Sequence, residues 1–100
     1  MKQNRKIFIK QISLERIYRL FELAGKEFEK HPERSKRYVE LARRISERNR
    51  VKIPKELKTK FCRRCNAFLM EGKNMEFFTK HGLRFMRCKE CGYERAVAKA

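Results

Sequence analysis

Four cysteines are the residues of this chain whose type and spacing could do chemistry. Cys62 and Cys65 form one C-x-x-C pair, Cys88 and Cys91 form a second, and 22 residues separate the pairs. Four thiolates at this spacing satisfy the tetrahedral shell of soft ligands that Zn²⁺ prefers. Because the protein would supply every ligand, we favour a structural zinc with no position left for a catalytic water. Two redox-active pairs or two disulfides are the alternative interpretations.

Each cysteine pair needs a tight turn that aims both sulfurs at one point. The residue after the second cysteine of such a turn adopts a left-handed backbone, which asparagine and glycine tolerate. Asn66 and Gly92 occupy these two positions. We therefore predict an antiparallel zinc ribbon over residues 61–100, with turns at 71–74 and 80–82. Its expected strands are 68–70, 75–79, 83–87 and 93–98.

Length and charge restrict the class of protein. One hundred residues are too few for a large apolar core, so a metal would replace part of the missing burial. Lys and Arg number 28 against 12 acidic residues, the net charge is +16, and every acid is Glu. This excess indicates a polyanionic partner, with nucleic acid as the first candidate and an anionic membrane surface as the second.

The sequence also bears on the compartment. No apolar run approaches the roughly 20 residues that cross a bilayer, and no signal-peptide core follows the first residue. Cysteines that are all used by a metal suit a reducing environment. We therefore expect a cytoplasmic protein with no membrane partner.

Two amphipathic helices are predicted ahead of the cysteines, at about 14–30 and 33–49, as an antiparallel hairpin spanning 13–50. Ser13 is a candidate N-cap, and Pro32 can open the second helix. Residues 1–12 would form a basic N-terminal arm. The hairpin holds more apolar residues than one interface needs, so the excess packs either on the rest of the chain or on a partner protein. The excess residues are Leu14, Leu23, Phe28 and Val39.

A basic connector at 51–60 joins the hairpin to the ribbon. Val51, Ile53 and Leu57 interleave with its charges, which predicts a packed segment, and Pro54 interrupts any continuous helix. Between residues 43 and 64 only two acids oppose ten basic residues, which favours a phosphate-contacting ridge over a merely solvated face. The ten candidates for RNA contacts are Arg43, Arg44, Arg48, Arg50, Lys52, Lys55, Lys58, Lys60, Arg63 and Arg64.

Aromatic residues are dense in the predicted ribbon. Most of them should form its core, and one or two could instead be exposed as platforms on which RNA bases stack. The residues are Phe61, Phe68, Phe77, Phe78, Phe85 and Tyr93.

The order of these parts resembles a known family, the archaeal ribonuclease P protein component 4, which is related to a zinc-ribbon subunit of eukaryotic ribonuclease P. The resemblance covers about residues 14–95. Its most specific part is the I-P-x-x-L-K-x-x-F-C-x-x-C run at 53–65, followed by Gly72, Asn74 and the Cys88-x-x-Cys91-Gly92 turn. The chain departs from the family pattern at Glu71, where proline is common, and at 75–79, which lacks the arginines often found there.

The resemblance implies a non-catalytic, RNA-binding subunit of an endoribonuclease whose RNA removes the 5′ leader of precursor tRNA. It implies a structural zinc on Cys62, Cys65, Cys88 and Cys91, with Mg²⁺ entering only through the RNA subunit. The implied partners are the ribonuclease P RNA, precursor tRNA indirectly, and another small protein subunit bound by the hairpin. Candidate residues for that protein contact are Ile17, Leu20, Phe21, Tyr38, Leu41 and Ile45.

Two other classes of function compete with this interpretation. A zinc-ribbon module of the ribosome or the transcription machinery, binding RNA or DNA, has the same composition, and only the hairpin and the connector motif argue against it. A metallo-nuclease is disfavoured because the thiolate shell is closed, the chain has no Asp, and its glutamates form no evident two-metal cluster.

Overall fold

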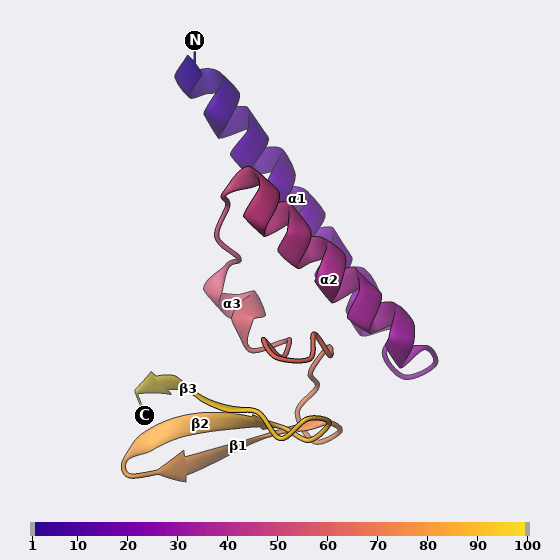
Figure 1. Ribbon diagram of the computed structural model, residues 1–100, viewed down its shortest axis with the longest axis vertical. Coiled ribbons are helices and arrows are strands. Elements are labelled where there is room, and N and C mark those ends of the chain that lie inside the picture. The colour runs from indigo at the N-terminus through magenta and orange to yellow at the C-terminus, as the bar shows by residue number, and fades with distance from the viewer. Residues whose placement is uncertain (1, 100) are drawn as a thin grey trace.

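The computed structural model describes residues 2–99, so Met1 of the predicted arm and Ala100 of the predicted ribbon lie outside the described residues. Three helices precede three strands along the chain (Figure 1). They are α1 (Lys2–Glu27), α2 (Pro32–Asn49), α3 (Lys55–Lys58), β1 (Met75–Lys80), β2 (Leu83–Cys88) and β3 (Glu94–Lys99). The predicted fold class, a helical hairpin followed by a small antiparallel sheet, is confirmed.

The first helix begins far earlier than predicted. It starts at Lys2 and runs without a break, so a helix start near residue 14 and an N-cap at Ser13 are both wrong. The first helix-weakening glycine comes only at Gly25, and Ser13 is accommodated inside the helix. Its buried hydroxyl donates to the Ile9 carbonyl at 2.7 Å and accepts from Asn49 Nδ2 at 2.8 Å.

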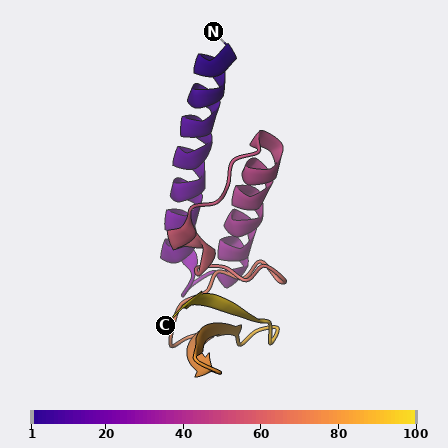
Figure 2. The same ribbon diagram turned by 90° about the vertical axis from the view of Figure 1, so that its left-hand side faces the viewer.

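The N-terminal part of α1 projects beyond the end of α2 (Figures 1 and 2). The contact between Ser13 and Asn49, at the last residue of α2, marks where the paired region ends. Beyond it, Ile7 and Phe8 are 55% and 61% exposed, which is unusual for large apolar side chains. The segment predicted as an arm is therefore a continuation of α1 with nothing from α2 beside it.

Small residues let the two helices approach each other closely. Ser35 is fully buried, and its hydroxyl donates to the Ala24 carbonyl at 2.6 Å across the interface. Pro32 opens α2, as predicted, where its missing N–H costs no hydrogen bond. At the other end, Arg50 closes α2 in a left-handed conformation.

The hairpin core extends into the connector and the first cysteine turn. Leu57, Phe61 and Phe68 are buried against α1 and α2. Of the six ribbon aromatics only Phe77 and Tyr93 pack in the ribbon core, so the prediction that most of the six form that core is wrong. The Phe61 ring lies 5.6 Å from that of Phe21, and the Phe68 ring lies 5.8 Å from that of Phe28. A hairpin of two helices leaves one side open, and these rings cover part of it.

The connector is a packed segment, as predicted. Pro54 precedes α3, and the chain does not continue α2 into α3. Val51 and Leu57 are buried, and the Tyr18 hydroxyl donates to the Glu56 carboxylate, joining α1 to α3. The hydrogen bond to Glu56 raises the pKa of Tyr18 and lowers that of Glu56.

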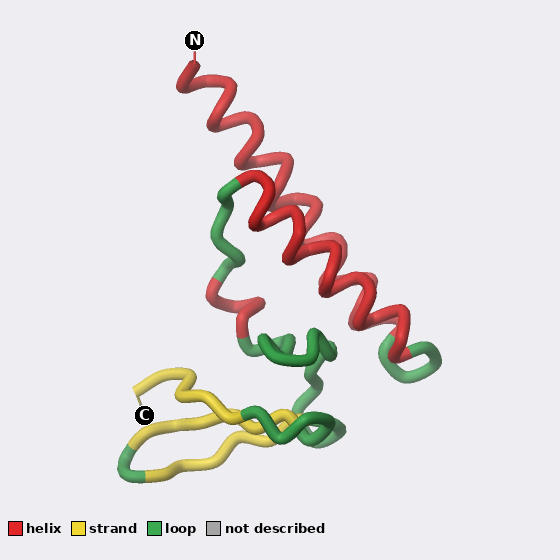
Figure 3. Tube along the Cα trace, viewed as in Figure 1, coloured by secondary structure: helices red, strands yellow, loops and turns green. Residues whose placement is uncertain are grey.

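The sheet has the order β1-β2-β3 with both pairs antiparallel (Figure 3). The predicted strand at 68–70 is wrong, since this segment forms only one isolated bridge, from Phe68 to Phe61. The Asn74 side chain takes the place of a strand partner there. Its Oδ1 accepts from the Met70 N–H at 2.8 Å, and its Nδ2 donates to the Phe68 carbonyl at 2.7 Å.

Burial differs sharply between two isoleucines of α1, and stability should follow that difference. Ile17 is fully buried between the helices, whereas Ile7 is 55% exposed on the projecting part. We expect Ile17→Ala to lower the free energy of unfolding by about 2–5 kcal/mol through lost burial and a cavity. The matched change Ile7→Ala should stay within about 0.5 kcal/mol. Urea unfolding of the zinc-loaded protein measures both changes in the free energy of unfolding. Equal losses of stability from the two substitutions would contradict the position of α1.

Candidate metal centre and nucleic-acid interface

The two cysteine turns have the same backbone geometry. In the first knuckle, residues 62–66, the Asn66 N–H donates to the Cys62 carbonyl at 2.9 Å; in the second, residues 88–92, Gly92 donates to Cys88 at 2.8 Å. Asn66 and Gly92 have φ values of 63° and 81°, so the predicted left-handed positions are confirmed. Asparagine and glycine adopt this conformation at little cost, which is why the chain can turn here.

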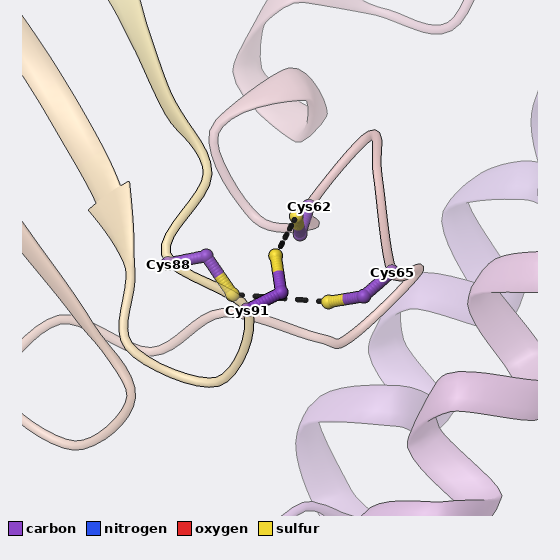
Figure 4. A group of neighbouring side chains, drawn as sticks. All are labelled: Cys62, Cys65, Cys88 and Cys91. Atoms are coloured by element: carbon purple, nitrogen blue, oxygen red, sulfur yellow. Dashed lines mark hydrogen bonds between the residues drawn. The ribbon is translucent and has the colours of Figure 1, made fainter.

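The knuckles bring all four sulfurs together (Figure 4). The sulfurs lie within 4.8 Å of one another, with Cys62 and Cys91 3.5 Å apart and Cys65 and Cys88 3.8 Å apart. These separations exclude disulfides, which need S–S of about 2.05 Å. A tetrahedral ion with metal–sulfur bonds of about 2.3 Å needs sulfurs about 3.8 Å apart, so the site fits a four-thiolate metal ion.

Burial makes two of these thiols harder to ionise. It raises the pKa of Cys65 to about 12 and raises the pKa of Cys88 as well. Burial also opposes the Cys91 thiolate, but hydrogen bonds from the Tyr93 backbone and from neighbouring thiols outweigh it and lower that pKa. A bound metal ion supplies the positive charge that four adjacent thiolates require.

Asn74 ties the second knuckle to the segment before the sheet. Besides its bonds to residues 68 and 70, its Nδ2 donates to Glu90 Oε2 at 2.9 Å, and its carbonyl accepts from the Lys89 N–H at 2.8 Å. Asn74 as a whole is 9% exposed, so its polar groups need these bonds in place of water. Sequence reasoning noticed Asn74 only as a motif position, since its contacts lie up to sixteen residues away.

Arg43 docks the first knuckle on α2. Its guanidinium donates to the Arg63 carbonyl at 3.0 Å and to Asn66 Oδ1, and it lies 5.5 Å from the centre of the Phe61 ring. These contacts hold the knuckle against the helix. We therefore remove Arg43 from the candidate RNA surface, because this cation is already used within the protein.

Three of the predicted RNA-binding residues lie on the first knuckle or just before it in the chain. Lys60, Arg63 and Arg64 are exposed, and we call them the knuckle surface. No acid occurs in the sequence from 57 to 70. Burial lowers the pKa of Arg95, and the nearby Arg63 lowers it further, as expected where positive charges crowd together. Arg50, Lys52 and Lys55 are also exposed, and Lys58 is partly buried, with its carbonyl accepting from Arg95.

Other predicted residues meet in a groove between α1 and α2. Two arginines predicted to bind RNA, Arg44 and Arg48, lie beside Leu20, Leu41 and Ile45, which were predicted to bind a protein. This hairpin groove has a volume of about 870 Å³, and Arg16, Arg19 and Glu47 complete its lining. Sequence reasoning missed Arg16 and Arg19, although the spacing of 16, 19 and 20 already places them on one helix face.

The remaining candidates for protein contact lie inside the molecule or at its edge. Ile17 and Phe21 are buried in the hairpin core, so they are not available to a partner. Tyr38 is partly buried against the same core. Of the excess apolar residues, Val39 is buried in that core, Phe28 packs against it, and Leu14 and Leu23 are half-buried.

In the part of the chain that the structure describes, no helix is both long and apolar enough to cross a membrane.

A helical hairpin docked on a ribbon with four clustered cysteines defines a small protein with a site that could hold one metal ion in an all-cysteine shell. The chain belongs to the RNAse P Rpr2/Rpp21/SNM1 subunit domain family, whose model matches residues 16–92. Ribonuclease P protein component 4 of Methanosarcina acetivorans is 45% identical over 93 residues, covering 93% of this chain and 87% of that protein. Its counterpart in Methanosphaera stadtmanae is 43% identical over 91% of this chain and 88% of its own length.

Two solved structures are similar as well. A chain in a cryo-EM structure of archaeal ribonuclease P with mature tRNA matches with a TM-score of 0.82 and 37% identity, over 88% of this chain and 77% of that chain. A structure described as Pfu Rpp21 matches with a TM-score of 0.58 and 39% identity, over 82% of this chain and 93% of its own. These findings confirm the family that the sequence resembles.

Metal removal should affect the two halves of the fold unequally. We expect a chelator, or Cys62→Ser, to unfold the ribbon, because its small core surrounds the cysteines. Much of the helical signal should remain, but the hairpin should melt at a lower temperature, since Phe61 and Phe68 leave its core. Far-ultraviolet circular dichroism and amide dispersion in NMR measure the two effects. Adding Zn²⁺ back should reverse the chelator effect, and an unchanged sheet without metal would contradict a structural role.

Proposed function

We propose that this chain is an RNA-binding, non-catalytic protein subunit of ribonuclease P, the endoribonuclease that removes the 5′ leader of precursor tRNA. The observation that carries the proposal is the close match to a chain of an archaeal ribonuclease P over most of the present fold. The catalytic RNA performs the hydrolysis and holds the Mg²⁺ ions. The four thiolates form a closed shell, which supports a structural rather than a catalytic task for this protein.

The physical task of the subunit is to neutralise phosphates. Folded RNA brings phosphates close together, and cations that offset their repulsion let the active fold form at lower Mg²⁺. A net charge of +16 on 100 residues suits this task. Precursor tRNA is contacted only indirectly, through the RNA that the protein supports.

The knuckle surface is our first candidate for the RNA contact. Arg63 and Arg64 are exposed on a turn that the metal would make rigid, and the exposed Lys60 lies just before it, so little conformational entropy of the backbone is lost on binding. Arg50, Lys52 and Lys55 extend the positive charge along the connector.

The hairpin groove is our candidate for the second protein subunit. Leu20, Leu41 and Ile45 offer an apolar floor, and a partner protein covers such a surface more readily than RNA does. Arg44 and Arg48 on its rim would pair with acidic residues of that partner, so we assign them to protein rather than to RNA.

Zinc is the metal that this ligand set selects in a reducing compartment, since thiolates favour it over Mg²⁺ or Ca²⁺. We therefore assign one structural Zn²⁺ to Cys62, Cys65, Cys88 and Cys91, and we place the protein in the cytoplasm. Metal analysis of the purified protein, with one zinc per chain expected, tests the assignment.

The activity of the protein is best tested together with its RNA. We expect the isolated protein to cleave no precursor tRNA, yet to lower the Mg²⁺ concentration that the cognate ribonuclease P RNA needs for half-maximal cleavage. Cleavage rates across a Mg²⁺ titration, with and without protein, measure this. Cleavage by the protein alone, surviving removal of contaminating RNA, would overturn the proposal.

Mutations in the knuckle surface and in the hairpin groove should affect RNA binding and protein binding separately. Changing Lys60, Arg63 and Arg64 together to Gln should reduce the slope of log RNA affinity against log salt by about 2, because three phosphate contacts are lost. Leu41→Glu should leave that slope unchanged and should abolish binding of the second protein subunit, since it puts a charge on the groove floor.

A charge-matched control distinguishes local contacts from net charge. Lys30, Lys36 and Arg37 are exposed at the far end of the hairpin, and their joint change to Gln removes the same charge. Equal loss of slope in both triple variants would mean that the knuckle surface has no special role. Loss of RNA affinity in Leu41→Glu would mean that the groove binds RNA.

A further inference from the structure

The sheet has one face that packs in the ribbon core and one face that joins no buried cluster, on which Phe78 and Phe85 are half-buried. Phe77 and Met86 lie opposite each other on the inner face, beside the cysteines. Because side chains alternate along a strand, Phe78, Phe85 and Arg87 lie on the outer face. Neither Phe78 nor Phe85 joins a buried cluster, and the next outer residue of β2, Leu83, is 41% exposed.

The outer face carries an ordered stack. Arg87 lies 4.7 Å from the centre of the Phe78 ring, and that ring lies 5.5 Å from the Phe85 ring with only 17° between their planes. Glu76 and Glu94 hold Arg87 from both sides, each at 2.8 Å. Residues from three strands therefore hold the Arg87 guanidinium, the Phe78 ring and the Phe85 ring in one stack.

The stack is covered by a charged group at one end and has no further stacking partner at the other. The paired Arg87 caps the end near the second knuckle. Among the residues that the structure describes, Phe85 pairs with no ring other than Phe78 and with no cation. Beyond it, toward the β1–β2 turn, lie Leu83 and Lys80, both exposed.

We propose that this outer face of the ribbon binds unpaired RNA, with a nucleotide base extending the stack from Phe85 and the adjacent phosphate near Lys80. Aromatic rings at a fixed distance and nearly parallel offer the geometry in which bases stack. The inference rests on the proposed function only in taking RNA as the ligand. It adds a second contact, to bases instead of phosphates, on a surface separate from the first knuckle.

Charge favours RNA over a protein as the occupant. Arg87 pairs with both acids of the outer face, so that cluster keeps one net negative charge at the covered end of the stack, whereas Lys80 at the open end pairs with no acid among the described residues. The chain as a whole carries +16. The apolar side chains by themselves would suit a protein partner as well as RNA bases, so binding of a protein is one outcome of the test.

The test replaces the ring while keeping its bulk. We expect Phe85→Leu in the zinc-loaded full-length protein to weaken binding of a single-stranded RNA containing 2-aminopurine by roughly 5- to 100-fold. Stacking quenches this base, so the quenching on binding should also be lost. The affinity should fall by the same factor at every salt concentration, because stacking releases no counterions. Binding of a matched RNA duplex should not change.

Three further variants sharpen the result. Phe85→Tyr retains the ring and should retain both affinity and quenching, and Ile7→Ala removes an exposed apolar side chain on α1, away from this face, and should have little effect. Lys80→Gln should reduce the salt slope by about 0.7, as one phosphate contact to a single strand is lost. If Phe85→Leu misfolds, judged by metal content, Phe85→Met takes its place with the same expectation.

The outcomes separate this proposal from the function on which it rests. Unchanged single-strand binding and quenching in Phe85→Leu, with normal RNA binding by the unaltered protein, would overturn the stacking surface alone. Equal losses for single strand and duplex would overturn it too. If only binding of the second protein subunit is lost, the face is a protein contact. Failure of the unaltered protein to bind any RNA would instead overturn the proposed function.

Discussion

The convergence of four cysteine sulfurs is the constraint on which the rest of this structure depends. Burial raises the pKa of Cys65 and Cys88, so four thiolates at this spacing would need a bound cation to balance their charge. A metal ion held there would fix both knuckles, and each knuckle directs the segments attached to it. The second leads into β3, and the first aims Phe61 and Phe68 into the helical hairpin. A chain of 100 residues thereby gains a rigidity that its small cores could not supply.

The same constraint joins the two halves into one unit. Phe61 and Phe68 complete the hairpin core, and Arg43 fastens α2 to the carbonyl and the amide side chain of the first knuckle. On the other side, Arg95 of β3 donates to the carbonyl of Lys58 at the end of α3. Polar side chains that bond to backbone carbonyls in this way define one relative position of helices and ribbon, and apolar contact alone would allow several.

Positive charge is divided among tasks rather than spread over one surface. Arg43 and Arg95 act inside the protein, Arg44 and Arg48 border an apolar groove, and Lys60, Arg63 and Arg64 face outward. A run of ten basic residues in the sequence therefore does not equal one phosphate-binding ridge. Helical geometry explains part of this division, since residues 43 and 44 of one helix point about 100° apart.

Much of this protein can be predicted from the sequence by itself. Residue types and local spacing predict the cysteine turns with Asn66 and Gly92, the helix opened by Pro32, the break at Pro54 and the three strands, because these features depend on near neighbours. The tertiary structure alone decided that Ser13 lies inside a helix and that Phe61 and Phe68 serve the hairpin. It also decided that Arg43 is internal and that Phe78 and Phe85 face outward. Each of these depends on a partner far away in the chain, and the pattern of neighbouring residues carries no information about that partner.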